Sequence, residues 1–151
     1  MIEHQFYNIH LAKNKITEIK ILPEKISTKK FLKSSITNKL PKIYIIKHKS
    51  EIIYVGITTQ SIVNRLRYGF TANGKNGYHG YKWKSLDEID LLVYLFANSS
   101  EKIEAIEAEI VYHVRSKTGF WPKYQTEIHF HNATQKEKDV AHEIYKEALK
   151  I

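Results

Sequence analysis

The stretch from Pro41 to Phe70 constrains the fold of this chain most tightly. Two runs rich in β-branched and aromatic residues, 43–46 and 52–57, are separated by the polar residues 47–51. This pattern is typical of a β-hairpin. A helix is predicted over 61–69, because threonines precede it and a glycine ends it. The stretch therefore predicts a strand, a tight turn, a second strand and a helix.

The remaining segments predict further strands and helices around this unit. Residues 89–96 are nearly all apolar, which indicates a strand buried on both faces at the centre of a sheet. The other predicted elements are an N-terminal hairpin in 1–24 that turns at Asn14-Lys15, a short helix over 29–36, a helix over 101–116 that begins after Asn98-Ser99-Ser100 and ends at Gly119, a short strand over 127–131, and a last helix that is capped at 132–134 and runs to Leu149.

Composition narrows the classes of function. The chain has 151 residues, which suits a single domain, 1–151, with its own core. It contains no cysteine, which excludes disulfides and thiolate metal sites and favours a cytoplasmic location. The net charge of +8 favours a polyanionic partner such as nucleic acid, although a lysine-rich surface gives the same charge. No apolar stretch predicts a membrane span or a signal peptide.

One carboxylate lies on the apolar face of the helix predicted over 101–116. Five apolar residues define that face by their helical spacing: Ile103, Ile106, Ile110, Val111 and Val114. Glu107 falls within the same stripe, since it is four residues after the first of them and three before the third. A carboxylate there is costly unless it is paired or holds a cation. Glu107 is therefore either a metal-binding or catalytic group, or one half of a buried ion pair.

The predicted hairpin places two tyrosines on one face of the sheet. Tyr44 and Tyr54 become direct cross-strand partners if the turn has an odd number of residues. Tyrosines on such a face are usually core residues, but their hydroxyls need partners, and here two hydroxyls converge. Gly56 would leave room on this face for a backbone or a phosphate to approach. In the following helix, Arg65 lies on the side of Tyr68, where it would bind a phosphate or remain an ordinary surface residue.

Residues 70–84 form a loop in which three glycines alternate with aromatic and basic residues. A segment of this length without a predicted element is either a functional loop or a connector. We expect contacts with DNA from this loop and from the preceding helix. The expected positions are 67, 73, 75, 81 and 82, which are Arg67, Asn73, Lys75, Tyr81 and Lys82; position 73 offers an amide and no charge.

A second group of polar residues lies in the strand predicted over 127–131. Glu127, His129 and His131 alternate, so their side chains would share one face. Two imidazoles and a carboxylate suggest zinc, but no further ligand follows at a recognisable spacing. Contact with nucleic acid, or an ordinary strand surface, is the preferred interpretation.

Four elements in order, of which the hairpin with its two tripeptides is the first, resemble the GIY-YIG nuclease family. Lys42-Ile43-Tyr44 and Tyr54-Val55-Gly56 resemble its two tripeptides, Arg65 follows in the next helix, Glu107 lies in a helix that is similar to the family's glutamate helix, and Pro122-Lys123-Tyr124-Gln125 resembles the end of its motif. Each motif alone is weak. The combination is specific, because the helix-face argument selects Glu107 independently. The resemblance divides the chain into an N-terminal extension (1–40), a catalytic core (41–125) and a C-terminal strand and helix (126–151).

The resemblance implies an α/β (α+β) fold with a small, mostly antiparallel three-stranded central sheet flanked by helices. It also implies metal-dependent hydrolysis of DNA. Tyr44 would be the general base or would position the attacking water, and Tyr54 would hold water or phosphate. Arg65 would stabilise the phosphate charge, and Glu107 would bind one divalent ion, Mg²⁺ or Mn²⁺. A tyrosine has an ordinary pKa of about 10, so Tyr44 needs help from Lys42 or from metal-bound water.

The chain departs from the family pattern at three positions. Lys42 replaces the first glycine, at the start of a strand. Gly69 stands one helical turn after the arginine, where the family often has His or Tyr, and Tyr68 or His79 is the expected substitute. Gln125 replaces the closing asparagine and keeps the amide with a longer reach.

The expected function is a DNA endonuclease. Restriction-type cleavage of duplex DNA is preferred over repair and mobile-element roles, because the insertions lie inside the catalytic domain. A homodimer would supply the second site needed to cut both strands. Two alternatives remain open at this point: a non-catalytic nucleic-acid-binding module on the same fold, and a protein-interaction domain in which Glu107 forms a buried ion pair.

Overall fold

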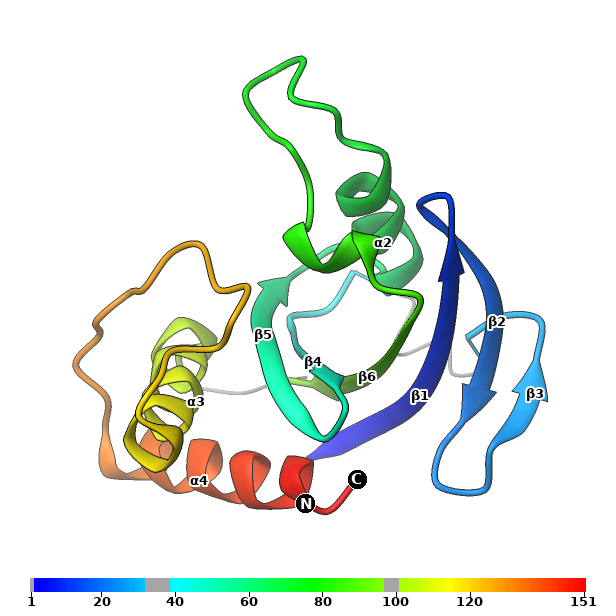
Figure 1. Cartoon of the computed structure of the whole chain (residues 1–151). Coiled ribbons are helices and arrows are strands. Elements are labelled where there is room, and N and C mark those ends of the chain that lie inside the picture. Colours follow the sequence, from blue (N-terminus) through cyan, green and yellow to red (C-terminus); the bar gives the residue numbers. More distant parts are fainter. Residues whose placement is uncertain (1, 32–38, 97–100) are drawn as a thin grey trace.

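The computed structural model describes residues 2–31, 39–96 and 101–151. Its centre is one antiparallel sheet of six strands in the order β3-β2-β1-β6-β4-β5 (Figure 1). The strands are β1 (Glu3–Ala12), β2 (Lys15–Ile21), β3 (Ile26–Thr28), β4 (Lys42–His48), β5 (Glu51–Thr58) and β6 (Glu88–Leu95). The helices are α2 (Ile62–Thr71), the short 3-10 helix η1 (Lys82–Ser85), α3 (Ile103–Thr118) and α4 (Gln135–Leu149).

The expectation of a three-stranded sheet was wrong in its strand number. β4, β5 and β6 form the expected antiparallel unit, but β1 pairs with the other edge of β6, from Glu3–Leu95 to His10–Glu88. The physical reason is that β6 is almost entirely buried, so the backbone groups along both of its edges need partners. The N-terminal hairpin supplies the missing partner. It therefore extends the same sheet.

β6 separates two apolar clusters, which confirms its predicted place inside the sheet. Leu91 and Val93 point into a cluster that includes residues of α2, whereas Leu92 and Tyr94 point into a cluster that includes residues of α3 and α4. Figure 1 shows the same division, with α3 and α4 packed together away from α2. Among the described residues, no helix is long and apolar enough to cross a membrane.

The ends of several elements differ from the sequence prediction. α2 continues past Gly69 to Thr71. α3 ends at Gly119 and Thr134 caps α4, as predicted. The predicted helix over 29–36 falls largely on residues 32–38, and Asn98-Ser99-Ser100 also lies outside the described residues.

The strand predicted over 127–131 is wrong, because this segment is irregular. The free edge of β5 is already used just before it. The backbone N–H of Tyr124 donates to the Ile53 carbonyl at 2.9 Å. The Gln125 side-chain amide then pairs with both backbone groups of Val55, at 3.0 and 2.9 Å. Residues 127–131 are left without a strand partner on that edge.

Lys47 attaches the end of α4 to the sheet. Its side chain is 1% exposed, and its ammonium donates to the carbonyls of Ala148 at 2.6 Å and Ile151 at 2.7 Å. A cation at the C-terminal end of a helix is favoured by the helix dipole. Burial lowers the pKa of this ammonium, and the nearby Asp90 opposes that shift.

We predict that Lys47→Met destabilises the fold, because the backbone oxygens of Ala148, which is buried, and Ile151, which is partly buried, lose their charged donor. The expected loss in the free energy of unfolding is about 1–3 kcal/mol, measured by urea denaturation. Lys49→Met is the matched control: this lysine is exposed in the β4–β5 turn, and its replacement should change stability by less than about 0.5 kcal/mol. Equal losses in the two variants would contradict the role assigned to Lys47.

Candidate active site

A cavity of about 390 Å³ lies at the edge of the sheet formed by β5. It is enclosed by β5, by α3 and by the irregular segment after Gln125, which run side by side in Figure 1. Its lining residues are Tyr54, Val55, Gly56, Ile57, Glu104, Glu107, Gln125, Thr126, Glu127, His129 and His131. The fold thus brings Tyr54 and Glu107, from opposite halves of the sequence motif, into one cavity.

Glu107 enters this cavity from the apolar face of α3. Its neighbours Ile106 and Ile110 are fully buried, and Glu107 itself is largely shielded from solvent. Burial raises the pKa of this carboxyl to about 7; His129 opposes the rise, whereas Glu104 and Glu127 add to it. None of the ion pairs between described residues involves Glu107. The buried ion pair considered from the sequence is therefore not formed within the described part of the chain.

Tyr44 and Tyr54 lie on one face of the hairpin, as predicted. Tyr44 pairs with Gly56 and Tyr54 pairs with Ile46, so the two tyrosines are diagonal neighbours, with ring centroids 5.9 Å apart. The direct pairing considered for an odd-numbered turn does not form. The turn has two residues, and the register shifts between Ile46 and Lys47.

The two tyrosines have different surroundings. Tyr44 has no exposed surface, and its hydroxyl oxygen lies 2.8 Å from the hydroxyl oxygen of Tyr81. Burial raises the pKa of Tyr44 well above its ordinary value. Burial also raises the pKa of Tyr54, while a hydrogen bond with Tyr44 and the charge of Arg65 oppose that rise. Of the two, it is Tyr54 that lines the cavity beside Glu107.

Gly56 serves the packing of Tyr44, which corrects the sequence interpretation. A Cβ atom at position 56 would lie 2.5 Å from Cζ of Tyr44. The space left by the missing side chain is therefore filled by the tyrosine ring. It is not free for a phosphate on that face, although the backbone of Gly56 still lines the cavity.

Arg65 is held among tyrosines next to this pair. Its guanidinium carbon lies 4.7 Å from the ring centroid of Tyr81, and its Nη2 donates to the Tyr78 hydroxyl at 3.2 Å. Nη1 is buried and has no hydrogen-bond partner among the described residues. A guanidinium stays charged at any relevant pH, and a buried donor without a partner is costly. The Nη1 donors of Arg65 are therefore left unsatisfied within the described part of the protein.

Two of the expected supporting residues, Lys42 and Tyr68, lie outside the lining of the cavity. Lys42 donates to the carbonyls of Leu40 at 2.6 Å and Gln60 at 3.0 Å, which joins the ends of β4 and β5, and burial lowers the pKa of Lys42 to about 8. Tyr68 is 54% exposed and stacks on Tyr78, with centroids 5.0 Å apart.

The residues expected to contact DNA or zinc differ in their exposure and in their neighbours. Arg67, Asn73, Lys75 and Lys82 are exposed, but Tyr81 is 3% exposed, so it is a core residue and no surface contact. His129 contacts Glu127, with Nε2 and Oε2 3.1 Å apart. No group of three His, Asp or Glu side chains that could hold a metal occurs in the described part of the chain, which gives the zinc alternative no support.

The sequence analysis did not predict the contacts that two further tyrosines make with Arg65 and Tyr44. Tyr78 bonds Arg65, and Tyr81 bonds Tyr44. One signal was present, because Gly69 lies in a helix interior, where glycine is unfavourable unless a bulky neighbour needs the space. The ring of His79, one of the expected substitutes at this position, lies against Gly74 instead.

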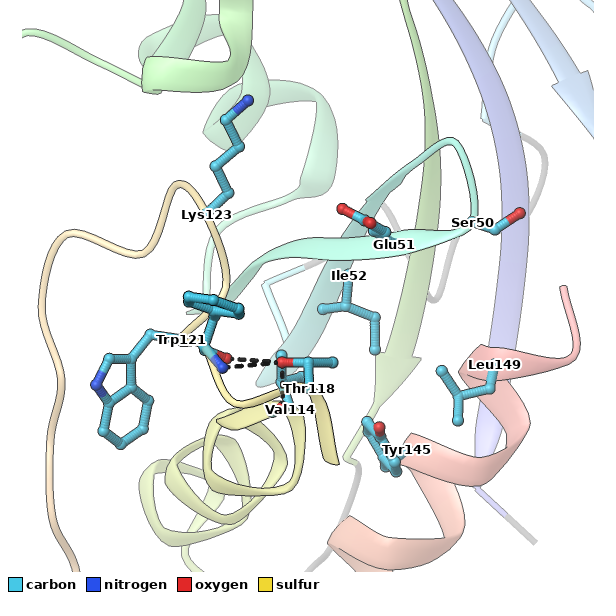
Figure 2. A pocket seen from close by; sticks show the side chains of 10 residues that line it. Ser50, Glu51, Ile52, Val114, Thr118, Trp121, Lys123, Tyr145 and Leu149 are labelled. Carbon is cyan, nitrogen blue, oxygen red and sulfur yellow. Dashed lines mark hydrogen bonds between the residues drawn. The ribbon is translucent and has the colours of Figure 1, made fainter. Parts of the chain in front are cut away.

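A second cavity, of about 420 Å³, lies between the β4–β5 turn and the C-terminal ends of α3 and α4. Figure 2 shows Ile52, Val114, Trp121, Tyr145 and Leu149 among its lining residues. Its dashed lines mark the hydrogen bonds of the Thr118 hydroxyl, which donates to the Val114 carbonyl at 2.7 Å and also bonds the backbone of Phe120, at 2.9 and 3.2 Å. This cavity is mainly apolar and contains none of the predicted catalytic residues.

We predict that Glu107 makes the metal-free protein less stable as the pH rises. Its pKa is raised from 4.5 to about 7 on folding. Its stabilising contribution is thus fully present below the unfolded pKa and is lost as the pH rises through the folded pKa. In EDTA, Glu107→Gln should stabilise the protein by about 2 kcal/mol at about pH 8 and far less at about pH 5.

Urea denaturation at the two pH values measures this difference. Glu24→Gln, which changes an exposed carboxylate outside the site, is the control and should give the same change in stability at both. An effect of Glu107→Gln that does not depend on pH would refute the prediction.

Comparison with known proteins agrees with this geometry. A family model described as the GIY-YIG catalytic domain matches residues 41–120, more than half of the chain. The matched range includes Tyr44, Tyr54, Arg65 and Glu107. Comparison with curated proteins gives no match, and comparison with solved structures gives none either. Nucleases of the matched family act on DNA. The chain belongs to the GIY-YIG nuclease family.

Proposed function

We propose that this protein is a metal-dependent endonuclease that hydrolyses phosphodiester bonds in DNA. One observation carries the proposal: the Glu107 carboxylate is partly desolvated in a cavity that it shares with Tyr54, and no cationic side chain among the described residues forms an ion pair with it. Burial of the charged carboxylate lowers the free energy of unfolding, and a bound cation would offset that cost.

The donor set around Glu107 suits a hard divalent cation. Glu104 and Glu127 line the same cavity and add negative charge. Mg²⁺ or Mn²⁺ takes few protein carboxylates and completes its shell with water and phosphate oxygens, so one carboxylate ligand is sufficient. When bound, the ion would neutralise charge that develops on the phosphate and on the leaving oxygen.

The side chains of this chain would then divide the remaining tasks. Tyr54 lines the cavity, so its hydroxyl can orient a water molecule or a phosphate oxygen there. Arg65 has a buried donor available, and it would stabilise negative charge on the scissile phosphate. Tyr44 has no exposed surface and lies behind Tyr54, with ring centroids 5.9 Å apart, so it would act on the attacking water through Tyr54.

Cleavage of the restriction type is the form of the activity that we propose. The support is that the exposed polar residues Asn73, Lys75 and Lys82 lie in a loop inserted between α2 and β6, and Arg67 is exposed on α2 itself. These side chains would bind the phosphate backbone of duplex DNA near the cavity. The described part of the chain holds one such site, and we propose that two copies act together to cut both strands.

We predict that the purified protein nicks or linearises supercoiled plasmid DNA in Mg²⁺ and not in EDTA. Glu107→Gln should lower the rate at least about a hundredfold, while DNA binding persists. Glu109→Gln is the control and should cut normally. In addition, Mg²⁺ should raise the melting temperature of the wild-type protein and not that of Glu107→Gln.

Sequencing of the cut ends would separate discrete sites, expected for restriction, from dispersed ones. Binding without cleavage over a broad panel of DNA substrates would favour the alternative, a non-catalytic nucleic-acid-binding module. Cleavage by Glu107→Gln at the wild-type rate would refute the metal assignment.

We also predict different effects for two arginines of α2. Arg65→Ala should lower the single-turnover rate at saturating protein more than it lowers affinity for DNA, because the buried guanidinium would act on the scissile phosphate. The exposed Arg67→Ala should mainly weaken binding and reduce its dependence on salt. Filter-binding and single-turnover assays measure the two quantities. An unchanged rate for Arg65→Ala would contradict its proposed role.

A further inference from the structure

Tyr81 reaches the catalytic tyrosines from outside the hairpin that carries them. It lies just before η1, in the loop that follows α2. Its hydroxyl oxygen is 2.8 Å from that of Tyr44. The ring of Tyr44 in turn lies against the ring of Tyr54, with centroids 5.9 Å apart, and Tyr54 lines the cavity. The three tyrosines thus form a connected group that runs from the core to the cavity.

Two glycines allow Tyr81 to occupy this place. A Cβ atom at position 69 would lie 2.0 Å from the Tyr81 ring, so the ring fills the space that Gly69 leaves open. The backbone N–H of Tyr81 donates to the Gly69 carbonyl at 3.0 Å. Gly80 has a φ of +79°, and a Cβ atom there would lie 2.1 Å from the same carbonyl oxygen. The loop is therefore docked on α2 at a point that only small residues permit.

The ring of Tyr81 is fixed on several sides. It stacks on Trp83 with centroids 4.5 Å apart and an interplanar angle of 22°. Phe70 meets it edge-on with centroids 5.9 Å apart, and the Arg65 guanidinium carbon lies 4.7 Å from its centroid. A buried ring with this many contacts places its hydroxyl within a narrow range. Such a hydroxyl is suited to fix the direction of a partner's proton or lone pair.

We propose that Tyr81 is a positioning residue of the nuclease site, because its hydroxyl orients Tyr44 and, through Tyr44, the cavity-facing Tyr54. This inference rests on the proposed endonuclease activity. Tyr81 does not contact the substrate in this scheme. Its effect is on the direction in which the two other hydroxyls present themselves to water and phosphate.

Tyr81→Phe tests the proposal, because it removes the hydroxyl and keeps the ring over Gly69. The single-turnover cleavage rate in Mg²⁺ should fall by about tenfold or more, while affinity for DNA stays within about twofold. Tyr94→Phe is the matched control: it removes the hydroxyl of a buried tyrosine in the other apolar cluster and should cut at the wild-type rate.

A double-mutant cycle separates positioning from a general loss of stability. If Tyr81 acts through Tyr44, the Tyr81→Phe change should have no further effect on the rate of a Tyr44→Phe variant. Equal losses in both backgrounds, or a wild-type rate for Tyr81→Phe, would overturn the proposal.

A measurement without DNA or metal distinguishes failure of the two proposals. In protein labelled with ¹³C at tyrosine Cζ, Tyr81→Phe should shift the Tyr44 and Tyr54 resonances, and Tyr94→Phe should not. Unchanged Tyr44 and Tyr54 resonances refute the positioning role. If they shift but the wild-type protein cuts no DNA, the orienting contact is supported and the endonuclease proposal fails.

Discussion

The burial of β6 on both faces and along both edges is the constraint on which the rest of the structure depends. Its alternate side chains enter two separate apolar clusters, so helices must cover the sheet on both sides. Its edges must be paired, so β1 and β4 take the neighbouring places. β5 is thereby left at the edge of the sheet. The candidate site forms there because side chains from the two layers can meet around an edge strand, with Tyr54 on one side and Glu107 on the other.

The site concentrates polar groups that the fold has partly removed from water. Glu107 is shielded on an apolar helix face, and Nη1 of Arg65 is buried without a partner among the described residues. Each of these groups lowers stability by itself. The charges of both groups act on Tyr54, and the phosphate and cation that we propose would offset the cost of both. The groups that lower the stability of the fold therefore lie where we propose that an anionic substrate and a metal ion bind.

Much of this arrangement could be predicted from local patterns. The hairpin, the α2 helix, the central β6 strand and the place of Glu107 on its helix face all follow from side-chain periodicity, which short segments carry by themselves. The strand predicted over 127–131 failed, because a strand exists only with a partner edge, and Tyr124 and Gln125 already occupy that edge of β5. The sheet's true width was missed for the same reason, since pairing of β1 with β6 joins residues that are far apart in the chain.

Sequence by itself determined the family of the chain and the face on which each hairpin tyrosine lies, and it proposed Tyr44, Tyr54, Arg65 and Glu107 as the site residues. These inferences depend on residue type and on spacing within an element. Tertiary structure alone decided which tyrosine reaches the cavity, that Gly56 makes room for the Tyr44 ring, and that Tyr81 packs over Gly69. These contacts lie between separate elements and depend on how single side chains pack against each other. No pattern within a single element specifies these contacts.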